Sequence, residues 1–424
     1  MNKIIMTLAL VLVSSSVFSQ WNKINSFPNT GVNDIFISGN TVYAATANNG
    51  IYRSTDMTAT WQQFNNGLNN LQAIHCAQII QTGSILYAAT EDGIYRSTDN
   101  AASWIKKSDG ILIGSGSIYL SSQSIFEHNG ILFTGTYSGI YRSTNSGENW
   151  LATNISGTHI WAKNFTLHNG IIFAARESIN NPTGYSSTDN GITWSNLQGP
   201  SFFSTITFFS EPGKLFTGTI HGAWLSTNNG INWVERSAGL TPDPYNSSFV
   251  RTNGVLVSSL KFGGSGMFKS NNDGILWENF GQGLPFLNSI NEVIIFNSNI
   301  LAATSSGIYQ RNTSEVTGFT QVSTEIPGNF SLSQNYPNPF NPSSKIRFSI
   351  PQTEKSILKV TLTVYDITGR KAALLVNNNM KAGEYEADFN ASSFASGIYF
   401  YRLEVLSNGN NSVYSEVKKM SLVK

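Results

Sequence analysis

Cysteine is nearly absent from this 424-residue sequence. Cys76 is the only one, so the chain cannot form an intramolecular disulfide, and no Cys/His cluster with zinc spacing accompanies it. It stands in a strand-like segment, where a free cysteine typically packs as a small, unreactive apolar side chain. We therefore expect packing and strand pairing to stabilise the fold, with no metal site and no cofactor.

Charge is also scarce, since only 12% of the residues are charged and the net charge is +1. Residues 20–327 contain 14 Lys and Arg against 18 Asp and Glu, a net charge of −4. Residues 328–424 contain 11 against 7, a net charge of +4. Neither part has the basic stripe typical of nucleic-acid binders, so that class is excluded.

Long apolar runs are missing except at the N-terminus. Residues 1–19 combine Lys3 with an apolar run from Ile4 to Val13. This is the pattern of a secretory signal peptide, and the apolar run is too short to span a membrane as an anchor. We expect the Sec translocon and signal peptidase to process the chain, the mature protein to begin at Gln20, and no membrane span within it.

A repeated unit occupies most of the sequence. One copy reads LYAAT at 86–90, GIYRSTD at 93–99 and SW at 103–104. Six copies end in a tryptophan, and these tryptophans are 43, 46, 44, 39 and 44 residues apart: Trp61, Trp104, Trp150, Trp194, Trp233 and Trp277. A period of this length with four short strand-like runs predicts one four-stranded β-propeller blade per unit.

A seventh unit begins at residues 300–304 (ILAAT) and continues at 307–311 (GIYQR), but it stops before any tryptophan. The missing strand is found at the other end, because QWNK at 20–23 matches the fourth-strand pattern and Trp21 lies 40 residues before Trp61. We predict an all-β, seven-bladed propeller over residues 20–311, closed by its N-terminal strand. Closure of this kind removes exposed sheet edges.

The turn before each repeat tryptophan follows the pattern Ser-x-Asp-x-Gly-x-x-Trp, which residues 187–194 match in full. Six residues occupy its third position: Asp56, Asp99, Asn145, Asp189, Asn228 and Asn272. Their oxygens can accept N–H groups within the turn, and the tryptophan can pack between blades. The pattern resembles the Asp box, or BNR repeat, of sialidase-like propellers. The resemblance implies a structural role, on the face opposite the active site of that family.

After Arg311 the repeat gives way to residues 312–329, which we expect to form a linker. Five segments follow: FSLSQNYPNPFNP at 330–342, VYDITGR at 364–370, AGEY at 382–385, ASGIYFYR at 395–402 and KKM at 418–420. They resemble the type A C-terminal sorting domain of the type IX secretion system. The resemblance implies that the type IX machinery recognises residues 330–424 and that the domain is then removed, leaving a secreted or outer-surface protein.

The same C-terminal stretch alternates apolar and polar residues, which predicts a small Ig-like β-sandwich. Its expected strands are 346–350, 358–366, 384–390, 397–406 and 415–422. The segment Tyr336 to Pro339 contains two prolines, which lack N–H donors, so we expect it to cover an edge of the sandwich.

A sialidase would need three arginines that converge on a carboxylate. Arg53, Arg96 and Arg142 occupy one equivalent position in successive repeats, so we interpret them as structural. The Phe-Arg-Ile-Pro motif of sialidases is absent. We therefore expect no catalytic residues; the alternative is a secreted glycoside hydrolase of sialidase-like propeller type, with Glu177 and Glu292 as an acid/base pair.

The loops opposite the boxes differ most between repeats, so we expect any ligand there. The candidate binding residues are Tyr119, Tyr137, His159, Trp161, Arg176, Glu177, Tyr245 and Glu292. Aromatic faces stack on sugars, and amides and hydroxyls bond to sugar hydroxyls, so this mixture favours a neutral or weakly charged glycan, or a surface protein, as partner. Trp161 fits both a core position and a ligand platform. A purely structural surface-layer protein is a third interpretation.

Overall fold

The computed structural model describes the chain from Gln20 to Lys424 with short gaps. The described ranges are 20–112, 120–157, 160–177, 184–197, 204–241, 244–261, 266–285, 289–316, 319–323, 325–353, 358–391, 394–407 and 411–424. The expected signal peptide, Tyr119 and His159 lie outside them. No helix within these ranges is both long enough and apolar enough to cross a membrane.

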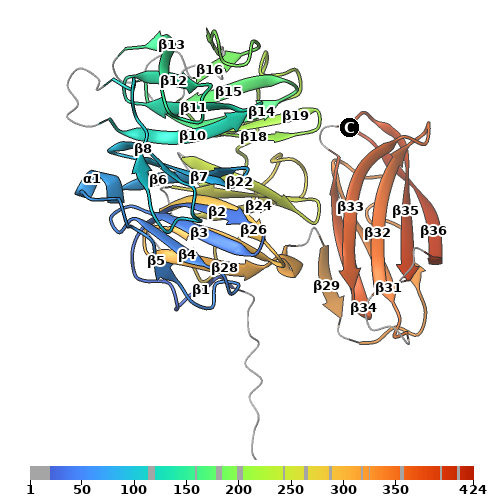
Figure 1. Cartoon of the computed structure of the whole chain (residues 1–424). Coiled ribbons are helices and arrows are strands. Elements are labelled where there is room, and N and C mark those ends of the chain that lie inside the picture. Colours follow the sequence, from blue (N-terminus) through green and yellow to red (C-terminus); the bar gives the residue numbers. More distant parts are fainter. Residues whose placement is uncertain are drawn as a thin grey trace, which may run out of the picture.

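Residues 22–312 form seven antiparallel sheets of four strands each, which confirms the seven-bladed propeller (Figure 1). Blades 1 to 3 contain β2 (Val32–Ser38), β3 (Thr41–Thr46), β4 (Ile51–Ser54) and β5 (Gln62–Gln63); β6 (Cys76–Thr82), β7 (Ile85–Thr90), β8 (Gly93–Ser97) and β9 (Ile105–Lys106); and β10 (Ser122–His128), β11 (Ile131–Thr136), β12 (Gly139–Ser143) and β13 (Leu151–Ser156). One helical turn, α1 (Leu71–Ile74), precedes blade 2 and is capped by Asn70.

The other four blades repeat this order. They contain β14 (Ala162–His168), β15 (Ile171–Arg176), β16 (Gly184–Ser187) and β17 (Ser195–Asn196); β18 (Thr205–Glu211), β19 (Lys214–Thr219), β20 (Gly222–Ser226) and β21 (Val234–Glu235); β22 (Asn246–Thr252), β23 (Val255–Leu260), β24 (Met267–Ser270) and β25 (Glu278–Asn279); and β26 (Ile290–Phe296), β27 (Asn299–Thr304), β28 (Gly307–Asn312) and β1 (Asn22–Lys23). Apolar residues of neighbouring sheets pack together between the blades.

Blade 7 is completed by the N-terminal strand, as predicted. Asn22 pairs with Gln310, and Lys23 pairs with Tyr309. Trp21 is only 2% exposed, and its indole N–H donates to the Phe280 carbonyl of blade 6 at 2.8 Å. The two ends of the propeller sequence therefore share one sheet and one core.

Three repeat tryptophans, Trp104, Trp150 and Trp277, join their blades to the preceding ones in the same way. The Trp150 backbone N–H donates to the Asp109 carbonyl at 2.8 Å, and its indole N–H donates to the Lys107 carbonyl at 2.9 Å. Gly110 follows Asp109 with φ +93°, and a Cβ there would lie 2.1 Å from the Trp150 carbonyl oxygen. Trp104 and Trp277 make equivalent bonds to their preceding blades.

The turns before the tryptophans are held by their own polar groups. The Asp189 carboxylate accepts the Ser187 hydroxyl at 2.8 Å and the Thr193 N–H at 2.9 Å. Hydrogen bonds from the side chain and N–H of Thr193 lower the pKa of Asp189 to about 2. Equivalent acceptor bonds are made in the other turns by Asp56, Asp99, Asn145, Asn228 and Asn272.

The three repeat-phase arginines contact these turns rather than each other. Arg96 donates to the Ser146 carbonyl of the next blade at 3.0 Å, and Arg142 donates to the Asn190 carbonyl at 3.4 Å. Arg53 donates in the same way to the Asn100 carbonyl. Each guanidinium is thus a link between neighbouring blades, and no three-arginine cluster forms from them.

Residues 319–422 form a sandwich of two four-stranded sheets (Figure 1). In sheet order, the strands are β29 (Phe319–Ser323), β34 (Gly383–Asn390), β31 (Ser343–Ile350) and β30 (Ser331–Leu332), and then β33 (Lys371–Met380), β32 (Leu358–Asp366), β35 (Gly397–Ser407) and β36 (Asn411–Leu422). Strands β29, β30 and β33 were not among the expected strands. A single apolar core fills the space between the sheets.

The expected linker at 312–329 is wrong in part. A 3₁₀ turn, η1 (Thr313–Glu315), continues from blade 7, and Val316 is fully buried in the propeller core. Strand β29 then pairs with β34 of the sandwich. Polar composition alone cannot reveal a strand whose partner lies more than 60 residues further along the chain. The connection between the two folded parts is therefore much shorter than expected.

The proline-containing segment covers a sheet edge, as predicted. The Asn338 side-chain oxygen accepts the Ser421 N–H at 2.9 Å, and the Phe340 N–H donates to the Ser421 carbonyl at 3.0 Å. These bonds occupy backbone groups of β36, an outer strand of its sheet. A covered edge does not template pairing with another chain.

Candidate functional site

The first strand of every blade faces the central channel and contains a β-bulge at an equivalent position. A bulge places two residues opposite one on the partner strand, which redirects a side chain. The second residue of each bulge gives seven side chains, which we call the channel ring: Asp34, Gln78, Ser124, Asn164, Thr207, Ser248 and Glu292.

Five members of the channel ring accept a backbone N–H from the first strand of the next blade. The five bonds are Ile79 N to Asp34 at 2.9 Å, Ile125 N to Gln78 at 2.9 Å, Phe208 N to Asn164 at 3.0 Å, Val293 N to Ser248 at 3.3 Å and Ile35 N to Glu292 at 2.7 Å. Ser124 instead donates to the Ala162 carbonyl at 2.9 Å. The ring therefore joins the blades through side chains of different chemistry.

Two carboxyl groups meet where blade 7 joins blade 1. Burial raises the pKa of Asp34 to about 6, although bonds from the Ile79 N–H and Glu292 oppose the rise. Burial and the Asp34 charge raise the pKa of Glu292 well above its usual value. The two carboxyl groups interact with each other, so the protonation of one changes the pKa of the other.

A cavity of about 310 Å³ opens along the channel ring. Its walls are mostly amides and hydroxyls, among them Asn33, Gln123, Ser247 and Asn291. Two cationic residues, Lys163 and Lys261, also line it. The cavity is large enough for a small ligand or the end of a larger one.

Glu177 links two sides of the channel mouth. Its carboxylate forms an ion pair with Lys163 of blade 4 and accepts a hydrogen bond from the hydroxyl of Tyr245, which precedes β22 of blade 6. Burial raises the pKa of Glu177, but the Lys163 charge and these hydrogen bonds outweigh that effect and hold the pKa below its usual value. Glu177 is therefore an ionised group that cross-links the mouth.

Lys261 lies on the same side of the mouth. Its ammonium is 5.7 Å from the centroid of the Tyr245 ring, and its backbone N–H donates to the Tyr245 carbonyl at 2.9 Å. Burial lowers the pKa of Lys261, and the neighbouring charge of Lys163 lowers it further, while Glu177 opposes the shift. An ion pair requires a carboxylate oxygen within 4.0 Å of the ammonium nitrogen, and among the described residues Lys261 has no such partner.

Two predicted aromatic residues come together at the mouth. The rings of Tyr137 and Trp161 are 5.0 Å apart and nearly perpendicular, at 86°. Trp161 immediately precedes β14 with φ +47°, and its carbonyl accepts the Glu177 N–H at 3.3 Å. Trp161 is partly exposed and belongs to none of the buried core clusters, so it lies outside the core.

The structure brings together Tyr137, Trp161, Glu177 and Tyr245 from the predicted set, and places Arg176 beside them as a buried residue. The acid/base pair of the alternative hydrolase interpretation is not supported, because Glu292 accepts the Ile35 N–H and Glu177 pairs with Lys163. Sequence reasoning missed Lys163. Its position in a channel bulge, two residues after Trp161, is the signal that would have identified it.

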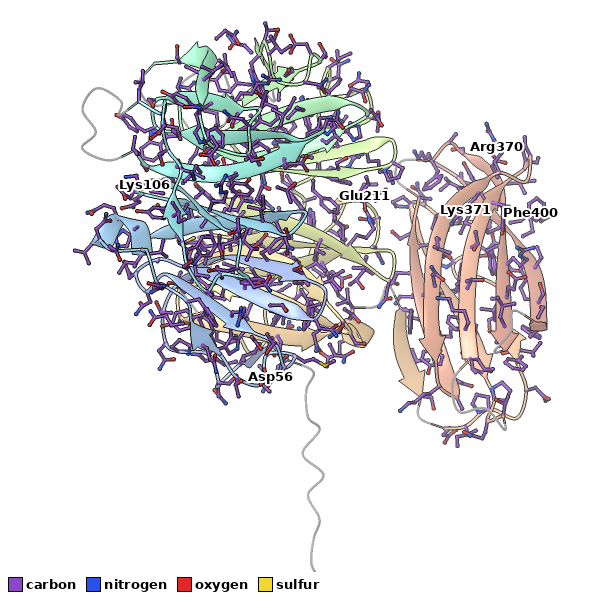
Figure 2. The ribbon with its side chains drawn as sticks, in the orientation of Figure 1. Asp56, Lys106, Glu211, Arg370, Lys371 and Phe400 are labelled. Carbon is purple, nitrogen blue, oxygen red and sulfur yellow. The ribbon has the colours of Figure 1, made fainter. Side chains whose placement is uncertain are left out.

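A larger cavity, of about 530 Å³, lies between propeller residues and sandwich residues. Glu211 and Lys371, both labelled in Figure 2, are among the residues that line it. One wall consists of the C-terminal domain, which the resemblance described above implies is removed after export. The channel cavity is built from the propeller alone, so it is the better candidate for a lasting function.

Comparison with known proteins identifies the C-terminal part. Residues 334–419 match the family described as the secretion system C-terminal sorting domain. This domain directs the protein to the type IX secretion machinery and so to the cell surface or the exterior. No curated protein matches the sequence.

Solved structures resemble the fold at low identity. YCF48 from Cyanidioschyzon merolae has a TM-score of 0.56 and 12% identity, over 70% of this chain and all of that one. The extracellular domain of the putative one-component system BT4673 from B. thetaiotaomicron has a TM-score of 0.55 and 14% identity, over 95% of this chain and 59% of that one. The Niastella koreensis GH74 enzyme has a TM-score of 0.55 and 12% identity, over 94% of this chain and 67% of that one. At these identities the likeness shows only that the fold is shared with propellers, and the chain as a whole is a propeller followed by a secretion sorting domain.

Proposed function

We propose that the repeat turns are Asp boxes and that the exported propeller binds a glycan at its channel mouth without cleaving it. One observation carries the proposal: amides and hydroxyls wall the channel cavity, and the Trp161 ring, which packs against Tyr137, lies 6.0 Å from the ammonium of Lys163, a residue that lines this cavity. Amides and hydroxyls can bond to sugar hydroxyls, and exposed aromatic faces can stack on the apolar faces of sugar rings.

The absence of catalysis is proposed from the positions of the acidic groups. Asp34 and Glu292 accept backbone N–H groups from neighbouring blades, as Gln78 and Asn164 do at the same position in other blades. Their place in the channel ring thus accounts for both carboxyls without a reaction. Raised pKa values are nevertheless typical of general acids, so a glycoside hydrolase is the second candidate.

The test is a glycan array probed with residues 20–424, followed by the variants Trp161→Ala and Tyr137→Ala. We expect both variants to weaken binding by about tenfold or more, because rim aromatics lose a large contact area. Ile231→Ala is the matched control, since Ile231 is 71% exposed on a turn of the opposite face. Binding that survives both rim substitutions refutes the site, and conversion of a bound glycan, measured by mass spectrometry, refutes the non-catalytic assignment.

A further inference from the structure

The charges at the channel mouth are unevenly distributed. Lys163 and Lys261 lie close enough for their charges to interact, and both contribute to the cavity wall. Glu177 neutralises one of these two charges through its ion pair with Lys163. The lysine side of the mouth therefore retains one positive charge, on Lys261.

A partly buried ammonium is costly unless it is paired, because burial removes part of its hydration. Within the described residues, the recorded contact of the Lys261 ammonium is the face of the Tyr245 ring, a weaker interaction than an ion pair. Asp34 and Glu292 also line the cavity, but each accepts a backbone N–H and neither forms a recorded ion pair with Lys261; most other lining groups are neutral amides and hydroxyls. Lys261 is thus a cation placed in a cavity without a carboxylate partner from the described part of the chain.

Glu177 shows which anion this mouth accommodates. Its carboxylate sits between a lysine ammonium and a tyrosine hydroxyl, Lys163 and Tyr245. Lys261 lies beside the same tyrosine ring and faces the same cavity. A second carboxylate, brought by a ligand, would find a similar environment there.

We propose that the ligand of this cavity carries a carboxylate, as the uronic acid units of acidic glycans do, and that the Lys261 ammonium binds it. The inference rests on the proposed glycan-binding function and makes it more specific. It narrows the expectation of a neutral or weakly charged ligand, because lysine at the channel supplies a positive charge.

The experiment compares uronic acid oligosaccharides with their carboxyl-reduced counterparts, which have the same rings but no charge. Isothermal titration of residues 20–424 should give at least about tenfold tighter binding of the acidic form at low salt, since one charge-assisted bond is lost on reduction. The difference should shrink as salt is raised.

Variants assign the preference to Lys261. Lys261→Gln should remove the difference between the acidic and reduced forms, which should then bind with similar affinity. Lys261→Arg should keep the preference, because the positive charge remains. Lys106→Gln is the matched control: Lys106 pairs with Asp92 at 2.7 Å and does not line the cavity, so the preference should persist. Intrinsic tryptophan fluorescence checks that each variant is folded.

The outcomes separate this inference from the function on which it rests. Equal binding of acidic and reduced forms, or binding of neutral glycans alone, overturns the carboxylate assignment and leaves glycan binding in place. The absence of binding to every glycan removes both. Binding of a peptide through its free C-terminal carboxylate, lost on amidation, with no uronic acid glycan bound, overturns the glycan as the source of the anion.

Discussion

The carboxyl group of Glu292 in the last blade accepts the backbone N–H of Ile35 in the first blade at 2.7 Å. The two residues are 257 positions apart in the sequence. Glu292 also interacts with Asp34, the residue next to Ile35. The joint that closes the propeller therefore contains two buried carboxyl groups with raised pKa values, and its strength should depend on pH.

Asp34→Asn should make the propeller less sensitive to pH. Burial raises the pKa of Asp34 from 3.8 to about 6, so the folded state binds more protons than the unfolded state between these values. The contribution of Asp34 to stability is fully present below pH 3.8 and is lost as the pH rises through about 6. We expect the urea midpoint of the wild type to fall between about pH 4 and pH 7, and that of the variant to fall less. All nine tryptophans lie in residues 21–277, so fluorescence reports on the propeller.

Asp92→Asn is the control for that experiment. Burial alone would raise the pKa of Asp92, but bonds from Lys106, Tyr95 and Asn70 outweigh it and hold the pKa below its usual value. Removing this carboxylate should lower the urea midpoint by a similar amount at every pH in this range, so the dependence of the midpoint on pH should stay as steep as in the wild type. If the urea midpoints of the wild type and Asp34→Asn fell equally with pH, the raised pKa of Asp34 would not explain the pH dependence.

Gly110→Ala should destabilise the propeller much more than Gly130→Ala. Both glycines have positive φ, +93° and +76°, so both substitutions strain the backbone by about 1 kcal/mol. Only at Gly110 does the added Cβ also collide with a backbone atom, the Trp150 carbonyl oxygen at 2.1 Å. We expect a total loss of about 2–3 kcal/mol there. Equal losses in urea unfolding would show that the close approach to Trp150 has no energetic cost.

Trp21→Ala should open the joint between blades 6 and 7. The substitution removes a fully buried aromatic side chain and its bond to the Phe280 carbonyl, so we expect a loss of about 3–5 kcal/mol in the free energy of unfolding. Trp161→Ala is the comparison, because that side chain lies on the rim and its loss should cost much less. A result in which both variants unfold at the same denaturant concentration would contradict the role of Trp21 in closure.

Removal of the sorting domain should block delivery to the cell surface without unfolding the propeller. A cut after Val316 leaves that buried residue in the propeller and removes β29 together with its partner β34. We expect the chain 1–316, which keeps the expected signal peptide, to accumulate folded in the periplasm, as detected by fractionation and protease resistance. A cut after 327 should give a more protease-sensitive tail, since β29 then lacks its partner. Normal surface delivery of either truncated chain would exclude this sorting route.

The blade count and the closing strand could be predicted because the repeat period is strong and Trp21 is in phase with it. The channel ring could not be predicted, because one structural position is occupied by Asp34, Gln78 and Ser248, which share only an acceptor oxygen. Lys163 could not be predicted for a related reason. A single lysine on a strand looks like a solvated side chain until the bulge directs it into the cavity.

Strand β29 shows another limit of sequence reasoning. Its five residues stand in a polar stretch that resembles a linker, and it is a strand only because β34 supplies a partner. Local propensity carries no information about such a distant pairing. The edge cover at Asn338 and Phe340 was predictable, by contrast, since proline restricts pairing wherever it occurs.

The pairing of β1 with β28 has a consequence for a chain that emerges from an export pore N-terminus first. Trp21 appears early, but its acceptor at Phe280 follows 259 residues later. The ring stays open until blade 7 has passed, and the sorting domain comes directly behind it. A chain that stops short of blade 7 therefore lacks both the strands that finish the ring and the signal that admits it to the surface, so delivery selects for complete molecules.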